Sequence, residues 1–398
     1  MRVYMAPCGI GLGHITRAIP IAKELNARGI ETVFSTYLDG LEYAKRNHLP
    51  TYEAVPIYFR VTTDGAIDFK LTAASSGFSL GVRRFLRQVT HEIRFMKQFK
   101  PDVVFSDSRA SSLVAARLLR IPVVLMLNQF RVEIVRRPAG RRLSLQDRLF
   151  FFIANIGWLF IRTALQLVWI RSQIILVPDL PSPFTISAGN LAIPRRYSGK
   201  VKLIGPIVEK NQHKGASSHG EVSSVSRPLV YAAVSGPKVE RRILSRKLTD
   251  CLRDVSKHYE VVISRGEPNG SRKPRSLHGM KVYDWIEDQD SVIMASEIVI
   301  SRAGHGTIMK SLVHGKPMLL IPIPDHTEQY GNARRARALH VAEIIDQARL
   351  DRRTLKAAVN QILQGDEYRK HCVKIQEEAA SMRAVETACD GITSLAPS

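Results

Sequence analysis

Cysteine is scarce in this chain of 398 residues. Its four cysteines lie far apart and form no CxxC pair: Cys8, Cys251, Cys372 and Cys389. This spacing indicates neither a disulfide framework nor a zinc site, and it fits a reducing, cytosolic compartment. The chain also lacks a charged-then-apolar leader, because glycines interrupt the first apolar run at once. We therefore expect no secretory signal.

Acidic side chains are also in short supply. The sequence has 36 Asp and Glu residues against 58 Lys and Arg residues, which gives a formal net charge of +22. Such an excess implies a nucleic acid, an anionic membrane surface or a phosphorylated substrate as partner, although part of the charge is ordinary solvated surface. No recognisable nucleic-acid-binding module is present, so we expect no nucleic acid partner.

What the chain does contain is a glycine-rich turn, with Gly9, Gly11 and Gly13 at alternate positions before His14. An apolar run precedes the turn and a helical pattern follows it, so we expect a strand, a loop and a helix. Glycines let backbone N–H groups approach a ligand, and the helix start adds the positive end of its dipole. The turn therefore suits a phosphate or diphosphate, and the imidazole of His14 has no packing reason to lie there.

This turn does not match the dinucleotide-binding fingerprint. That fingerprint needs its third glycine where His14 stands, and an acidic residue at the end of the second strand, at 33–36, where none occurs. Nicotinamide cofactors are therefore disfavoured, and we expect no cofactor. A tight connection that binds no ligand is the alternative interpretation of the turn.

Short apolar runs alternate with helical patterns through both halves of the chain, which predicts an α/β fold. Two of the expected strands end in polar residues, Asp107 and Asn128. The carboxyl ends of parallel strands form the ligand-binding edge of an open sheet, so both residues are candidates for a site. Capping of the following helix is the alternative role for Asp107.

Length and a 45% share of hydrophobic residues predict a globular chain with two domains. A stretch rich in Lys, His, Ser and Gly at 209–227 predicts the linker between them. The domains are then expected at 1–208 and 228–398. A second stretch rich in Ser, Gly and Ala, at 62–81, is expected to be a mobile loop.

An apolar segment at 149–170 is just long enough to span a membrane, which takes about 20 residues. Asn155, Arg162 and Gln166 are spaced along one side of a helix and leave a wide apolar face. The pattern favours a helix that lies in the membrane surface, with the arginines before it against anionic head groups. A membrane span and a helix buried between domains are the alternatives. These arginines are Arg131, Arg136, Arg137, Arg141, Arg142 and Arg148.

The second half repeats the sequence of strand, small-residue loop and helix start at 298–307. Two such loops facing each other across a cleft would hold a diphosphate compound. Further along, Glu328 and Gln329 open another helix, where they are suited to sugar hydroxyls or, in the case of Glu328, merely to the helix dipole. Residues 288–290 have the DxD pattern of metal-using sugar transferases, but we interpret them as a helix cap and expect no metal.

Four segments together resemble a known family: GIGLGH at 9–14, SGP at 235–237, SRAGHGT at 301–307 and DHTEQYGNA at 325–333. They look like the GT-B glycosyltransferases close to MurG. They are also similar to the eukaryotic and archaeal transferases that add the second N-acetylglucosamine to a lipid-diphosphate-linked sugar. The resemblance implies two Rossmann-like domains facing across a cleft. It also implies an inverting, metal-independent transfer from UDP-N-acetylglucosamine to a polyprenyl- or dolichyl-(di)phosphate-linked sugar.

By position, the resemblance implies a base, an acceptor side and a donor side at the cytoplasmic face of the membrane. His14 would be the base and Asp107 its orienting carboxylate, because an imidazole suits proton abstraction near neutral pH. The acceptor would lie against Gly11, Gly13 and Asn128. The donor would be bound by Ser235, Gly236, Ile286, Arg302, Gly304, His305, Gly306, Thr307, Glu328 and Gln329.

The chain departs from the family pattern at two positions. MurG has a ribose-binding glutamate where this sequence has Lys310, and an acidic residue where it has Leu127. The alternative interpretation of Lys310 is a solvated helix residue. Separately, the alternative interpretation of His305 is a histidine that fills space at a helix start. A hydrolase or epimerase of UDP-sugars on the same fold is the alternative function, in which water or a ring proton replaces the acceptor hydroxyl.

Overall fold

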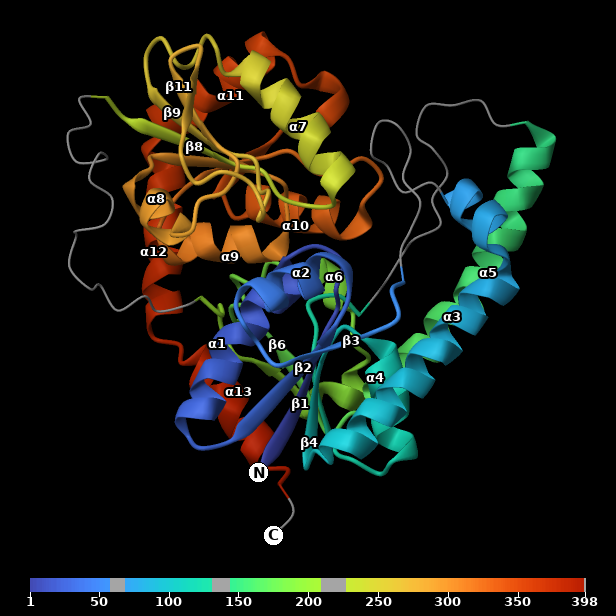
Figure 1. Ribbon diagram of the computed structural model, residues 1–398. Helices are drawn as coiled ribbons and strands as arrows, with labels where there is room; N and C mark the ends of the chain where they lie inside the picture. The colour runs from blue at the N-terminus through green and yellow to red at the C-terminus, as the bar shows by residue number, and fades with distance from the viewer. Residues whose placement is uncertain (58–68, 131–143, 209–226, 397–398) are drawn as a thin grey trace.

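The computed structural model describes residues 1–57, 69–130, 144–208 and 227–396. Each half of the chain forms one seven-stranded sheet with helices on both faces (Figure 1). The two halves are stacked, and both termini lie at the outer end of the N-terminal half. The predicted α/β fold with two Rossmann-like sheets is therefore confirmed. The expected linker, apart from its last residue, lies outside the described residues.

The N-terminal sheet is entirely parallel and has the strand order β3-β2-β1-β4-β5-β6-β7. Because β1 and β4 are central neighbours, the loops after them emerge side by side at the carboxyl edge of the sheet. The strands are β1 (Arg2–Pro7), β2 (Glu31–Thr36), β3 (Thr51–Glu53), β4 (Val103–Asp107), β5 (Val123–Met126), β6 (Ile174–Val177) and β7 (Val201–Leu203).

Helices bury both faces of this sheet. Val3 and Met5 pack with helix α1 on one face, while Tyr4 and Ala6 pack with α3, α4 and the end of α5 on the other. This alternation explains why β1 is an unbroken apolar run. The helices are α1 (Gly13–Ala27), α2 (Leu38–Arg46), α3 (Phe69–Phe99), α4 (Ala110–Leu118), α5 (Leu145–Ile170) and α6 (Ala188–Leu191), with a 3₁₀ helix at Arg195–Lys200.

The C-terminal sheet has the order β10-β11-β9-β8-β12-β13-β14, with only β10 antiparallel. Its central strands β8 and β12 correspond in position to β1 and β4. The strands are β8 (Leu229–Ala233), β9 (Glu260–Ser264), β10 (Arg275–Leu277), β11 (Met280–Tyr283), β12 (Ile298–Ser301), β13 (Met318–Leu320) and β14 (Ala342–Ile344).

The last helix of the chain returns to the N-terminal half. Ala384, Ala388 and Ile392 of α13 belong to the same core cluster as Val3 and Ile15. Helix α13 lies beside α1 (Figure 1). The domain expected at 228–398 thus includes a helix that stabilises the other sheet. The helices of this half are α7 (Lys238–Cys251), α8 (Gln289–Ala295), α9 (His305–Val313), α10 (Thr327–Ala338), α11 (Arg352–Gln364), α12 (Asp366–Ala380) and α13 (Ala384–Thr393), with a 3₁₀ helix at Gln347–Arg349.

The expected mobile loop at 62–81 is wrong for its second part. Residues 69–81 belong to α3, and 62–68 lie outside the described residues. Val89, Met96 and Phe99 in the second half of α3 are buried against the sheet, and this packing holds the helix in place. Alanine is a strong helix former, and tertiary packing of this kind outweighs the weak propensity of the serines and glycine beside it.

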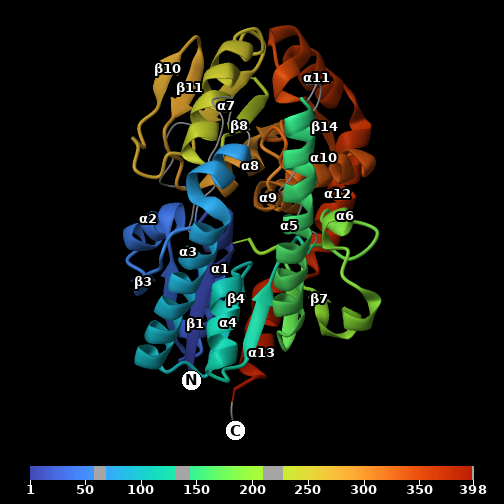
Figure 2. The same cartoon turned by 90° about the vertical axis from the view of Figure 1, so that its right-hand side faces the viewer.

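Helix α5 is exposed along most of its apolar length. Its segment Phe152–Ile170 is long and apolar enough to cross a membrane by length and composition, and only 11% of that segment is buried. Phe160 is 72% exposed, whereas Trp169 and Ile170 pack into the core. The alternative of a helix buried between domains is therefore wrong. Figure 2 shows α3 and α5 as two long helices on the same side of the molecule. Of the arginines expected before α5, Arg148 lies on the helix and the others lie outside the described residues.

Candidate active site

The first glycine turn connects β1 to α1, and two of its glycines are required by backbone geometry. A Cβ on Gly9 would lie 1.9 Å from the carbonyl oxygen of Tyr37, so no other residue fits there. Gly11 has φ +70°, which favours glycine. The N–H of Gly11 donates to Asp39 Oδ2 at 3.1 Å, and Gly13 begins α1. The expected acceptor residue Gly11 thus has its N–H occupied by a carboxylate of the protein.

His14 and Asp107 are in direct contact, as predicted. His14 Nδ1 lies 2.8 Å from Asp107 Oδ1, while Asp107 is fully buried and the His14 side chain is 25% exposed. The pairing of β1 with β4 brings them together, because Pro7 is opposite Asp107 in the register. Of the contacts that the structure describes for His14, none uses Nε2. The arrangement matches a general base whose second nitrogen is held by a carboxylate.

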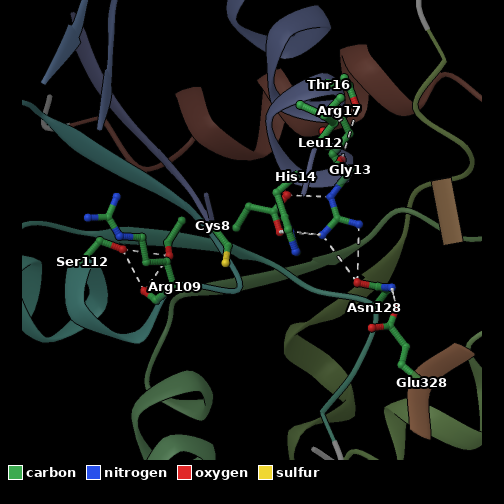
Figure 3. Close-up of polar contacts among 12 residues, drawn as sticks. Cys8, Leu12, Gly13, His14, Thr16, Arg17, Arg109, Ser112, Asn128 and Glu328 are labelled. Atoms are coloured by element: carbon green, nitrogen blue, oxygen red, sulfur yellow. Dashed lines mark hydrogen bonds and ion pairs between the residues drawn. The ribbon is translucent and has the colours of Figure 1, made fainter. Parts of the chain in front are cut away.

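Arg17 completes this cluster, and the sequence reasoning missed it. Its Nε and Nη2 donate to the two carboxylate oxygens of Asp107, each at 2.5 Å. Figure 3 shows its guanidinium between His14 and Asn128. Burial alone would raise the pKa of Asp107, but Arg17 and His14 outweigh it and hold that pKa well below its ordinary value. The spacing of three residues on one helix, which places Arg17 on the face of His14, was the available signal.

The second small-residue loop lies between β12 and α9. Gly304 is the N-cap of α9 and makes no side-chain capping bond, and a Cβ on Gly304 or Gly306 would meet nothing within 4 Å. Helix α9 contacts α1, whose N-cap residue Leu12 also makes no capping bond. Two helix N-termini without a capping side chain therefore belong to neighbouring helices at the boundary between the halves, where each favours an anionic group.

Two of the expected donor-binding side chains are used inside the protein instead. Arg302 is fully buried and donates to Glu240 Oε2 at 2.9 Å and to the carbonyl oxygens of Ile321 and Pro322. Burial lowers the pKa of Arg302 to about 10, against the opposing effect of Glu240. Gln329 accepts from the N–H of Ile323 at 2.9 Å. Both side chains hold the loop after β13 through these hydrogen bonds.

His305 is also buried, and its partner comes from the other half of the molecule. Its Nε2 lies 3.1 Å from Asp179 Oδ2. His305 is therefore paired with a carboxylate of the N-terminal half and does not simply fill space at the helix start. Asp179 additionally accepts from the N–H groups of Leu180, Ile186 and Ser187 and from Ser187 Oγ. Burial raises the pKa of Asp179, but His305 and Ser187 reverse this effect and lower it. Asp179 could not be identified from the sequence, because it lies in no recognisable motif.

Glu328 meets the N-terminal half directly. Asn128 Nδ2 donates to Glu328 Oε1 at 2.6 Å, and Figure 3 shows Glu328 on the far side of Asn128 from Arg17. An expected acceptor residue and an expected donor residue are thus brought into contact. Asn190 of α6 adds a bond of 3.2 Å to the backbone oxygen of Glu328. This boundary places the start of α10 against the carboxyl edge of the N-terminal sheet.

The remaining expected donor residues lie on loops that follow strands of the C-terminal sheet, except Thr307, which lies in the first turn of α9. Gly236 has φ +108°, and its carbonyl oxygen accepts from Arg241 Nη1 at 2.8 Å. Ser235 and Thr307 are partly exposed, and Ile286 is buried. Arg241 also lies 3.8 Å from Asp39, which connects the loop at 235–236 to the first glycine turn.

Lys310 and Asp288 both make contacts near helix α8 that bear on the sequence predictions. Lys310 Nζ lies 2.9 Å from Asp290 Oδ2, so it is paired rather than simply solvated. Asp288 accepts from Ser291 N at 3.0 Å and caps α8, which confirms the helix-cap interpretation of 288–290. Nearby, the guanidinium of Arg46 lies 5.7 Å from the ring centre of Trp285, so α2 covers the segment before Ile286.

Comparison with known proteins agrees with this geometry. Residues 238–387 match the glycosyltransferase family 28 C-terminal domain. An uncharacterized glycosyltransferase of Methanosarcina acetivorans is 27% identical over 342 residues, 84% of this chain and 82% of that protein. The UDP-N-acetylglucosamine–N-acetylmuramyl-(pentapeptide) pyrophosphoryl-undecaprenol N-acetylglucosamine transferase of Clostridium perfringens is 21% identical over 317 residues, 79% of this chain and 76% of that protein.

Solved structures share the fold over the whole chain. Acinetobacter baumannii MurG has a TM-score of 0.60 at 18% identity and covers 99% of both chains. The glycosyltransferase SsfS6 of Streptomyces sp. SF2575, complexed with thymidine diphosphate, has a TM-score of 0.65 at 16% identity and also covers 99% of both. The fold and the matched domain define a GT-B glycosyltransferase. More narrowly, residues 238–387 match the C-terminal domain of glycosyltransferase family 28, and the chain is similar over about four fifths of its length to glycosyltransferases of the MurG type.

Proposed function

We propose that this glycosyltransferase moves N-acetylglucosamine from UDP-N-acetylglucosamine to a sugar linked to polyprenyl or dolichyl (di)phosphate, with inversion and without a metal. The observation that carries the proposal is the contact between His14 and Asp107 at the start of α1, a helix that contacts α9. In the proposed arrangement, the acceptor hydroxyl lies against His14 and the donor diphosphate lies against the N-terminus of α9.

The reaction needs a base because a sugar hydroxyl is a poor nucleophile. His14 Nε2 takes the proton of the acceptor hydroxyl, while Asp107 holds Nδ1. The acceptor oxygen forms a bond to the anomeric carbon of the donor as the bond from that carbon to the diphosphate oxygen breaks, and UDP leaves with the electron pair. Because attack and departure occur on opposite faces of the carbon, the configuration inverts.

The leaving diphosphate needs positive charge or N–H donors. The N-terminus of α9 offers backbone N–H groups and its dipole, and the glycines at 304 and 306 leave open space for close approach. The thymidine diphosphate bound in SsfS6, a protein of the same fold, supports a nucleoside diphosphate as donor group. Glu328, at the start of α10, would accept hydrogen bonds from the donor sugar after its carboxylate is released from Asn128.

The acceptor assignment draws on the membrane-facing character of α5 and on the relatives. The exposed apolar residues of α5 suit the membrane surface, which would bring the site to a lipid-linked sugar. The activity for which the Clostridium perfringens relative is named supports a lipid-diphosphate acceptor and N-acetylglucosamine as the sugar. We place the protein at the cytoplasmic face of the membrane, held peripherally or by one monotopic helix.

One assay tests the proposal. The purified protein is incubated with a panel of UDP- and TDP-sugars and with a lipid-diphosphate-linked N-acetylglucosamine, in the presence and absence of EDTA. We expect UDP release from UDP-N-acetylglucosamine that depends on the acceptor, a disaccharide product by mass, and no loss of activity with EDTA. Release of UDP without acceptor would indicate a hydrolase instead, and absence of any release from the whole panel would contradict the proposal.

A further inference from the structure

We propose that Arg17 is a positioning residue of the transfer reaction, which fixes the carboxylate of Asp107 and through it the ring of His14. The inference rests on the proposed function, because it assigns His14 as the base. In the proposed reaction the proton is taken by His14 and not by Arg17, so Arg17 has a supporting role. It acts through its two hydrogen bonds to Asp107 and through its contact with Asn128.

The contact between Arg17 and Asp107 is a bidentate pair of hydrogen bonds from the guanidinium to the carboxylate. Nε donates to Oδ2 and Nη2 donates to Oδ1 of Asp107, so both oxygens are held in the plane of the guanidinium. Asp107 is fully buried and the Arg17 side chain is 10% exposed, so solvent does not weaken the pair. A carboxylate held at both oxygens cannot rotate, and Oδ1 stays directed at His14 Nδ1.

The contacts of His14 Nδ1 favour one tautomer of the ring. The guanidinium can only donate and the ionised carboxylate can only accept. His14 Nδ1 lies 2.8 Å from Asp107 Oδ1 and 3.2 Å from Arg17 Nη2, which already donates to Asp107 Oδ1 at 2.5 Å. The nearer carboxylate favours a hydrogen on Nδ1, which leaves the lone pair on Nε2. Nε2 is the nitrogen that a base must present to the acceptor hydroxyl.

Arg17 fixes the orientation of Asn128 by the same logic. Its Nη1 and Nη2 lie 3.4 Å and 3.5 Å from Asn128 Oδ1, which must accept because the guanidinium has no acceptor. The amide nitrogen of Asn128 therefore faces Glu328 Oε1. One side chain thus aligns the base and the amide that contacts the donor side.

A change in pH dependence follows for variants of Arg17. The groups that face Asp107 are Arg17 and His14 on α1 and the thiol of Cys8 after β1, while Glu328 interacts with Arg17 from α10. Burial raises the pKa of Asp107, and among the neighbouring charges Arg17 opposes this effect most strongly. Without Arg17, Asp107 therefore takes up a proton at a higher pH. A protonated Asp107 no longer holds the Nδ1 hydrogen of His14, so the transfer rate falls at a pH where the unmodified enzyme is still active.

Three variants separate charge from geometry. Arg17→Met removes both, and we expect kcat to fall by about 10²-fold with the donor KM unchanged, since misplacing a catalytic group by about 1 Å has this effect. Arg17→Lys keeps the charge but not the fork, so the acid limb of the pH profile should return to its original position while kcat recovers only in part. Arg28→Gln, at the other end of α1 in an exposed pair with Glu24 and Asp390, is the matched control.

A second measurement does not require activity. ¹⁵N NMR of histidine-labelled protein, assigned with His14→Ala, reports which ring nitrogen carries the hydrogen at pH 8. We expect the Nδ1–H form in the unmodified protein and a mixture of both forms in Arg17→Met. An unchanged tautomer in Arg17→Met would overturn the inference, as would an unchanged kcat and acid limb. If no sugar is transferred by the unmodified protein but the tautomer shifts as expected, the proposed function fails and the positioning role stands.

Discussion

The imidazole of His14 uses one ring nitrogen for Asp107 and leaves the other for a substrate. Replacing His14 by Ala removes the proton acceptor, so we expect the transfer rate to fall roughly 10²–10⁴-fold, the usual contribution of a positioned general base. UDP affinity should not change, because the donor contacts are assigned to the C-terminal half. The measurement is the rate of disaccharide formation, with UDP binding followed by calorimetry.

The control for this variant is thermal unfolding, since the His14 side chain is partly exposed and its removal leaves no large cavity. An unfolding temperature close to that of the unmodified protein shows that the rate loss is chemical. Full activity in His14→Ala would remove the assignment of the base. Loss of UDP binding would instead make His14 a donor contact.

At these single positions, sequence reasoning succeeded where one residue lies on a recognisable turn. The glycine turn marked His14, and the strand end marked Asp107, so their contact could be predicted from strand order. Arg302 and His305 were assigned to the donor because they share a loop with Gly304, but both side chains turn inward to Glu240 and Asp179. The direction of a side chain depends on partners more than 60 residues away, which no local pattern records.

Among the helices, the N-terminus of α9 is the proposed binding site for the donor diphosphate. Gly304 has φ −70° and ψ 134°, which any residue adopts, and a Cβ there meets nothing within 4 Å. Gly304→Asp therefore folds, but it places a carboxylate at the helix end where the diphosphate is expected. We predict that calorimetry detects no UDP binding in this variant, because like charges repel at short range.

The matched control is Gly304→Ala, which adds only a methyl group in open space. It should bind UDP about as well as the unmodified protein. Equal UDP affinity in a folded Gly304→Asp variant would contradict the assignment of α9 to the donor. Weak binding in both variants would mean that the backbone itself, rather than its charge, is the contact.

The exposed apolar residues of helix α5 lead to a prediction about membrane attachment. Phe152, Ile153 and Phe160 are 59%, 60% and 72% exposed, and none of them stabilises the core. Replacing all three by Ser should release the protein from anionic vesicles in a sedimentation assay, because apolar burial drives interfacial attachment. High salt alone should release it only in part, since screening acts on the charges and not on the apolar contact.

Leu118→Ser is the control for α5, because Leu118 is 65% exposed on α4 and outside that surface. It should leave vesicle binding unchanged. An unmodified protein that stays in the supernatant with anionic vesicles would contradict the membrane assignment.

The alternation of strands and helices could be predicted from the sequence, since apolar runs and helical periodicity are local signals. Element ends and one helix could not. Gly205 at φ +91° and Pro206 end β7 at Leu203, although apolar residues continue to 208. Residues 69–81 form part of α3 because the later part of that helix packs on the sheet, a tertiary effect that composition does not report.

Across the whole molecule, one segment of the N-terminal half, residues 179–190, makes several polar contacts with the C-terminal half. Asp179, Asn190 and the backbone oxygens of Thr185 and Pro183 contact α9 and α10. The return of α13 adds an apolar contact to the N-terminal core. Neither could be predicted, because a contact between domains depends on how two finished folds fit together.

Asp179 is the residue through which this junction can be tested. Its two oxygens accept five hydrogen bonds, one of them from His305 of the other half. In Asp179→Asn, an NH₂ group replaces one of the two carboxylate oxygens. This NH₂ donor then faces N–H and O–H groups that are themselves donors, so their hydrogen bonds are lost. Each buried donor left unpaired costs roughly 1–3 kcal/mol. We expect a clearly lower unfolding temperature at pH 7, whereas Asp250→Asn, in an exposed pair with Arg352, should change little.

The same variant has a distinct pH dependence. Because His305 and Ser187 lower the pKa of Asp179 despite its burial, the ionised form stabilises the fold above the ordinary aspartate pKa of about 3.9. That stabilisation is lost as the pH falls through the lowered pKa of the folded protein. The unmodified protein should therefore lose stability between about pH 4 and more acidic values, and Asp179→Asn should show a flatter curve there. Thermal unfolding from pH 7 to pH 3 measures both curves. Parallel curves would mean that Asp179 is not held ionised at the junction, and that His305 is retained by its packing alone.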